Sequence, residues 1–387
     1  MQDAVTLSSA SGMFRASYRP RHSPGSSGNG IAGVRHVSLV LCYLQALERL
    51  RSRLAELDWQ KPPQAPVQVE ILPIAVPFFE PSSKRIALPC RHEEPNLQVL
   101  RQRAAVEAAH EGMHAFTDAA RNPLSSDSSQ RSAEKQWRWM HEATAVMMEN
   151  FLFPDNPESL RFALEWADQP HVSLMAPAPS PWRYPDPYHA GYFLRYVVHR
   201  SDSGIISRLW NESQPDEAPF KALQRLLPGL GVLDAGAESS PLFSEYAFDS
   251  YFLGDCTLAS FAPDVQIRYR ERGLRSWCTL KAGETPPPFE DQVSNLACHY
   301  YRVDAREEVT VTLAHQRGTL ALFAGAVTRE MQRGRHSRTT AVASSTGAVQ
   351  TLRLPPPDPG DDYAVVCVAN PMVESTESPY TLTLSCL

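Results

Sequence analysis

The chain has 387 residues, of which 43% are hydrophobic and 21% charged, so it is long enough to bury more than one core. Its 37 basic and 43 acidic residues give a formal net charge of −6, which provides no positive field for nucleic acid or an anionic membrane surface. Seven cysteines without a C-x-x-C pair argue against a zinc ribbon or a thioredoxin-like redox site. The most apolar run, residues 37–47, is shorter than the roughly 20 residues that cross a bilayer, so no membrane span is expected.

The N-terminal part of the chain predicts a flexible start, one long helix and two strands. Residues 1–33 are small and polar and read as a flexible segment, with an alternating stretch at 13–18 that fits a short strand. Apolar residues then recur every three or four positions from Val37 to Leu57, which is typical of an amphipathic helix. Residues 67–72 alternate like a half-buried strand, and 85–88 predict a second strand at the edge of a sheet.

Two further helices are predicted before the middle of the chain. The first runs from about Asn96, a suitable N-cap, to Ala120 without a proline. The second follows Asp127, which forms a capping-box pattern with Gln130, and continues to Phe151. Shorter helices are expected at 157–168, 188–200, 204–211, 218–227 and 241–253.

After about residue 260 the pattern changes from helical periodicity to short alternating runs. Seven such runs, separated by turn-rich segments, favour a β-sandwich. The sequence therefore predicts an α+β protein with a helix-rich domain at 34–260 and a sandwich at 261–387. The expected strands cover 298–303, 309–314, 319–323, 339–343, 349–354, 363–368 and 380–385.

A short motif in the first of the two paired helices carries the chemistry. His110-Glu111-Gly112-Met113-His114 is an H-E-x-x-H pattern, which a chain of this composition would contain by chance only about 0.02 times. Side chains at i and i+4 share a helix face, so the two imidazoles can bind one metal ion while Glu111 reaches the water that the metal holds. The alternative is a pair of helical histidines with ordinary hydrogen bonds.

A catalytic zinc site needs a third protein ligand. A metzincin would have Gly at 117 and His at 120, where this chain has Thr117 and Ala120, so that pattern is excluded. Glu142, 28 residues after His114, lies in the next predicted helix. Two antiparallel helices with a short connection would bring Glu142 opposite the two histidines.

These residues carry a family resemblance. His110 to His114, followed by Trp139-Met-His-Glu142-Ala, resembles the gluzincin metallopeptidases and is closest to their hyicolysin-like group. The resemblance covers about residues 13–255, although the chain lacks the N-E-x-x-S-D of thermolysin and the G-x-M-x-N of the aminopeptidases. It implies a gluzincin-like domain that holds Zn²⁺ through His110, His114 and Glu142 and cleaves peptide bonds as an endopeptidase.

The resemblance also implies roles for groups around the metal. Glu111 would be the general base, and Tyr188 would donate to the oxyanion, with the neighbouring His189 as its competitor. Asp118 lies one turn after His114 and could orient an imidazole, or it is a solvated carboxylate. Glu149, seven residues after Glu142, could support the site or replace a ligand, or it is a surface residue. His141 is expected to be structural, because it points about 100° away from Glu142.

Two functions follow as expectations. The first is a zinc metallopeptidase that acts on a protein or peptide, with a sandwich domain that can hold a protein or glycan ligand. The alternative is a catalytically inactive zinc-binding protein that serves as a protein- or glycan-binding module. No signal-peptide pattern opens the sequence. Localisation is therefore left open between a secreted protein or effector, as the resemblance implies, and a cytoplasmic protein.

Overall fold

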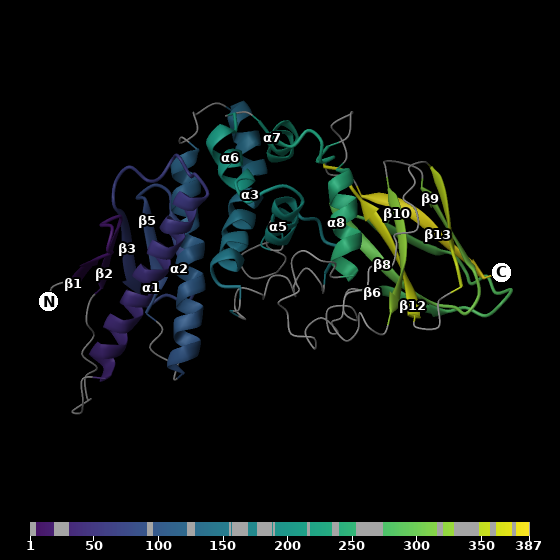
Figure 1. Ribbon diagram of the computed structural model, residues 1–387, viewed down its shortest axis with the longest axis horizontal. Helices are drawn as coiled ribbons and strands as arrows, with labels where there is room; N and C mark the ends of the chain where they lie inside the picture. The colour runs from purple at the N-terminus through teal and green to yellow at the C-terminus, as the bar shows by residue number, and fades with distance from the viewer. Residues whose placement is uncertain are drawn as a thin grey trace. The chain divides into compact units, whose positions relative to one another are not determined.

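The chain forms a mixed α+β structure, shown in Figure 1 as a computed structural model. It packs into two compact units, Met1–Arg161 with Asp202–Ala218 and Phe162–Ser201 with Pro219–Leu387. The predicted boundary at 260 does not coincide with this division. The structure describes residues 5–18, 31–90, 96–121, 128–154, 156, 169–175, 188, 190–214, 217–233, 240–252, 274–315, 320–328, 348–356, 361–373 and 377–386.

The first unit contains a five-stranded mixed sheet in the order β1-β2-β3-β5-β4. The pairs β2–β3 and β3–β5 are parallel, and the outer pairs β1–β2 and β4–β5 are antiparallel. Alternate residues of β3 are buried, as the sequence pattern predicts. The strands are β1 (Val5–Ser8), β2 (Phe14–Tyr18), β3 (Val67–Leu72), β4 (Phe78–Glu80) and β5 (Arg85–Pro89).

The structure extends one expectation about this sheet and corrects another. The strand expected at 13–18 is present as β2, and it forms a hairpin with β1, which the sequence pattern does not predict. The strand at 85–88 was expected at the sheet edge, but β5 lies between β3 and β4. At this end of the sheet the edge strand is β4, whose three residues are too few to show a period in the sequence.

Among the described residues, the first unit has four helices. They are α1 (Ile31–Glu56), α2 (Leu97–Ala120), α3 (Ser128–Leu152) and α6 (Ile205–Glu212). Helix α2 packs against the other three. The Asn96 side chain caps α2 by accepting hydrogen bonds from the N–H groups of Gln98 and Val99. Helix α2 packs against α1 where it carries Gly112, at which an added Cβ would lie 2.6 Å from Cδ2 of Leu47. Glycine therefore permits the close approach of these two helices.

The second unit contains a β-sandwich. Its sheets have the orders β10-β12-β8-β6 and β11-β9-β13-β7, and their facing side chains form one apolar core. This supports the predicted sandwich, although β6 and β7 were not predicted and the expected strand at 339–343 lies outside the described residues. The strands are β6 (Leu274–Thr279), β7 (Phe289–Val293), β8 (Ala297–Asp304), β9 (Val309–His315), β10 (Ala321–Thr328), β11 (Val349–Leu354), β12 (Asp361–Asn370) and β13 (Ser378–Cys386).

Helices also belong to the sandwich unit: α5 (Ala190–Arg200), α7 (Pro219–Leu226) and α8 (Pro241–Phe252). On α8, Phe248 stacks on Phe323 of β10, and the Tyr300 hydroxyl of β8 donates to the carbonyl of Ala247. Helix α8 thus covers the face of this sheet that points away from the sandwich core, and α5 packs against α8. The predicted helix at 157–168 lies outside the described residues. No helix among the described residues has the length and apolar character needed to cross a membrane.

Candidate metal centre

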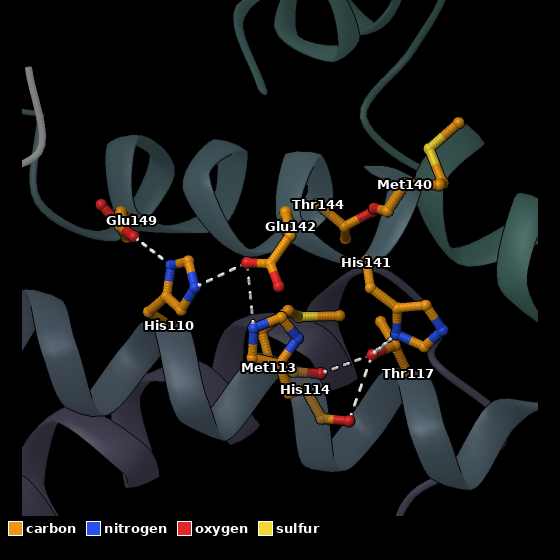
Figure 2. A network of polar contacts seen from close by, with 9 residues as sticks. All are labelled: His110, Met113, His114, Thr117, Met140, His141, Glu142, Thr144 and Glu149. Carbon is orange, nitrogen blue, oxygen red and sulfur yellow. Dashed lines mark hydrogen bonds and ion pairs between the residues drawn. The ribbon is translucent and has the colours of Figure 1, made fainter. Parts of the chain in front are cut away.

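Two neighbouring helices bring the predicted ligands together. His110 and His114 project from one face of α2 toward Glu142 on α3, as Figure 2 shows. One oxygen of Glu142, Oε2, lies 3.2 Å from Nε2 of His110 and 3.3 Å from Nε2 of His114. The ligand atoms of the three residues all lie within 4.8 Å of one another. The i, i+4 spacing on α2 and the pairing with α3 therefore produce the cluster that the sequence predicts.

The residues present fit a zinc ion. Zinc bonds to histidine nitrogen and carboxylate oxygen are about 2.0 to 2.2 Å, so neighbouring ligand atoms of a tetrahedral site lie about 3.3 to 3.5 Å apart. The two distances from Glu142 Oε2, 3.2 and 3.3 Å, are close to this separation. Two imidazoles and a carboxylate are also a donor set that zinc accepts. The geometry and the chemistry both support a metal site, although other divalent metals share these ligands.

Glu149 occupies the other side of the His110 ring. Its Oε1 lies 2.5 Å from Nδ1 of His110, and both side chains are buried (Figure 2). A carboxylate on the second nitrogen of a metal-binding histidine fixes the ring and its tautomer and makes the ligand more basic. The structure thus places Glu149 where it supports His110, and not on the surface.

The charges of the cluster reinforce one another. Burial alone would lower the pKa of His110, but hydrogen bonds with Glu142 and Glu149 hold that pKa well above its ordinary value. Burial alone would raise the pKa of Glu142, but His114 and His110 hold it well below its ordinary value. Without a metal, His110 therefore carries a proton that a cation would replace.

Glu111 lies in the same buried region with a different charge balance. Burial raises the pKa of its carboxyl, and the nearby Glu142 adds to the rise, whereas the two histidines and the backbone N–H of Phe79 oppose it. The net effect is a raised pKa. A raised carboxylate pKa suits a group that takes up and returns a proton near neutral pH.

A polar network adjoins the cluster on the side of His141 (Figure 2). Burial lowers the pKa of His141 to about 3, so its ring is neutral at pH 7. The Thr117 hydroxyl lies 2.8 Å from Nδ1 of His141 and 3.2 and 3.1 Å from the backbone carbonyl oxygens of Met113 and His114. The His141 ring also packs against Trp210 in an edge-type arrangement, with centroids 4.6 Å apart. This arrangement agrees with the structural role expected for His141.

The remaining predicted groups have different outcomes. Asp118 forms an ion pair with Lys84, which gives it a partner other than the expected imidazole. Tyr188 belongs to the second unit and is half-buried, and its role as an oxyanion donor stays a prediction. His189 lies outside the described residues. The sequence pattern does not indicate Lys84 as the partner of Asp118, because the two residues lie 34 positions apart.

Comparison with known proteins adds no relative. No protein-family model matches the chain, and no curated protein has a significantly similar sequence.

Proposed function

We propose that this protein is a zinc-dependent peptidase of the gluzincin type. The observation that carries the proposal is the convergence of His110, His114 and Glu142 beside the buried Glu111. A site that only stabilises the fold needs ligands but no carboxylate of raised pKa next to them. The presence of Glu111 therefore favours catalysis over the inactive zinc-binding module.

The chain's own residues would divide the work among them. His110, His114 and Glu142 would hold the ion, which when bound lowers the pKa of water and polarises a substrate carbonyl. Glu111 takes a proton from the attacking water and passes it to the leaving amine. Glu111 therefore ends the reaction in the protonation state in which it began. Glu149 accepts a hydrogen bond from the Nδ1–H group of His110, and this contact keeps Nε2 of the same ring directed at Glu142.

Metal analysis combined with substitution of Glu111 tests the proposal. Protein purified without chelators is expected to contain about one zinc per chain and to cleave members of a peptide library. Glu111→Gln should keep the zinc and lose at least 100-fold in kcat, because a general base contributes about 10² to 10⁴ in rate. Glu107→Gln, one turn earlier on α2, is the matched control and should retain full activity.

The possible outcomes separate the two functions. Zinc without cleavage by the wild-type protein would favour the binding module. Zinc-free protein that takes up no added metal would overturn both functions. Full activity of Glu111→Gln would remove Glu111 from the mechanism.

A further inference from the structure

Two side-chain contacts join α2 and α3 at different points along the helices (Figure 2). At one, Oε1 of Glu149 lies 2.5 Å from Nδ1 of His110. At the other, the Thr117 hydroxyl lies 2.8 Å from Nδ1 of His141. The two contacts are about two turns apart on each helix, and the partners follow in opposite order, so both fit one antiparallel register of α2 and α3. Glu142 lies between them on α3.

The register of the two helices decides whether the metal ligands meet. His110 and His114 come from α2, whereas Glu142 is the ligand that α3 provides. A slip of one residue along a helix moves a side chain by about 1.5 Å and turns it by about 100°. Zinc tolerates deviations of only about 0.2 Å in its bond lengths. Glu142 can therefore act as a ligand only if α3 is held in place, and His141 is its neighbour in the sequence.

The Thr117 hydroxyl is held in position on α2. It lies 3.2 Å from the backbone carbonyl oxygen of Met113 and 3.1 Å from that of His114. A side chain branched at Cβ has few rotamers in a helix, and those of threonine suit contacts of this kind. Thr117 is fully buried, so bulk water does not compete for its hydroxyl. The hydroxyl thus connects the backbone of His114, a metal ligand, with the ring of His141.

The ring of His141 is enclosed from the side of α6. Trp210, a fully buried residue of α6, packs against it with centroids 4.6 Å apart. The indole N–H of Trp210 donates to the Thr144 hydroxyl at 3.2 Å, and that hydroxyl donates to the carbonyl of Met140 at 2.7 Å. Trp210 is therefore tied to α3 itself. The ring of His141 cannot turn away from Thr117 without displacing a buried indole.

We propose that Thr117 and His141 are positioning residues that fix Glu142 relative to His110 and His114 before a metal ion binds. This inference rests on the metal centre of the proposed function. The contact adds no ligand and acts through the register of α2 and α3. Ligands that are already in place lose less conformational freedom when the ion binds, so the contact raises the affinity for zinc.

The zinc affinity of paired variants tests the contact. Thr117→Val keeps the shape of the side chain and removes the hydroxyl, whereas Thr117→Ser keeps a hydroxyl. We expect about tenfold weaker zinc binding for Thr117→Val, as for other groups that support metal ligands, and a change within about threefold for Thr117→Ser. Equal affinities of Thr117→Val and the wild-type protein, measured by competition with a chelator, would overturn the proposal.

A second pair of variants examines the other partner. His141→Phe keeps a ring against Trp210 and removes Nδ1, so its loss should match that of Thr117→Val. His141→Asn can place an amide near the position of Nδ1 and should stay within about threefold of the wild type. The double variant of Thr117→Val and His141→Phe should lose no more than either change alone, because both remove one contact. Additive losses would contradict the proposal. Each pair gives its own result, so either decides if a variant of the other fails to fold.

A third measurement separates the positioning of Glu142 from a general loss of stability. In a Glu142→Ala background the ligand is absent, so Thr117→Val should change the zinc affinity by less than about twofold. A tenfold loss in that background as well would overturn the proposal, because the contact would then act without Glu142. Tyr43→Phe is the matched control: it removes a buried hydrogen bond to the carbonyl of Pro89 and should leave the zinc affinity unchanged.

The same affinities distinguish this inference from the proposed function. A wild-type protein that binds zinc and cleaves no peptide would refute the peptidase function, and the variants of Thr117 and His141 would still decide the positioning role. A wild-type protein that takes up no zinc would overturn both.

Discussion

Glu149 is expected to control how tightly the centre holds zinc. Its Oε1 lies 2.5 Å from Nδ1 of His110, and its side chain is only 2% exposed, so bulk water does not compete for this contact. Loss of such an outer partner typically weakens metal binding 10- to 100-fold, which corresponds to about 1.4 to 2.7 kcal/mol. The contact is charge-assisted, which places it among the stronger hydrogen bonds of the site.

Two substitutions of Glu149 separate its charge from its hydrogen bond. Glu149→Gln keeps an acceptor for the ring N–H of His110 and removes the charge, so we expect the lower value, about a tenfold weaker zinc affinity. Glu149→Ala also leaves that buried N–H without its acceptor, which costs about 1 to 3 kcal/mol, so the loss should approach 100-fold. The order of the two variants follows directly from the geometry.

Competition with a chromophoric zinc chelator at pH 7.5 measures these affinities. Glu107→Gln serves as the control for removing a carboxylate from the same region, and circular dichroism confirms that each variant is folded. An affinity of Glu149→Ala within twofold of the wild type would refute the role of Glu149. An equal loss in Glu107→Gln would show that general charge, and not the contact with His110, sets the affinity.

Three further predictions concern protons and packing. Zinc affinity should rise by up to about tenfold per pH unit while His110 is protonated in the metal-free protein, because zinc displaces one proton. Zinc titrations at pH 6, 7 and 8 measure this dependence, and an affinity that does not change with pH would contradict it. Burial alone would raise the pKa of Glu48, but hydrogen bonds, chiefly from Ser11, lower this pKa from 4.5 to about 2. The ionised Glu48 therefore adds to the free energy of unfolding above pH 4.5, and this contribution is lost as the pH falls toward 2. Glu48→Gln should therefore destabilise by about 1 to 3 kcal/mol in urea unfolding at pH 7 and by much less at pH 3, whereas equal losses at both pH values would refute the linkage. Gly112→Ala should lower the free energy of unfolding by about 1 kcal/mol in urea unfolding, because the clash with Leu47 outweighs the higher helix propensity of alanine. A stabilised variant would show that Leu47 moves freely.

The metal cluster could be predicted because its determinants are local. The i, i+4 spacing of His110 and His114 follows from helix geometry, and the position of Glu142 follows from two consecutive helices that pack together. Glu149 shares the face of Glu142 by the same periodicity, so the sequence could nominate it as a supporting group. The contact with His110, and not a surface position, became visible only in the structure.

Contacts between distant segments could not be predicted in the same way. Lys84 and Asp118 are both charged residues in polar surroundings, and nothing in the sequence pairs them. The division into units depends on how helices pack on the strands. Alternation along a strand shows that one face is buried, but it does not show which element covers that face. The change of periodicity near residue 260 therefore marks a change of secondary structure and not a boundary of packing.

The five residues from His110 to His114 show why the motif needs a central, enclosed helix. Successive side chains on a helix point about 100° apart, so five consecutive residues face every direction. On α2, the histidines face α3, Glu111 is buried, and Gly112 meets α1. Each direction imposes its own demand: a metal ligand, a buried carboxylate, or the absence of a side chain. A two-sided amphipathic helix on the protein surface could satisfy only some of them, so the layers on three sides of α2 are part of the site.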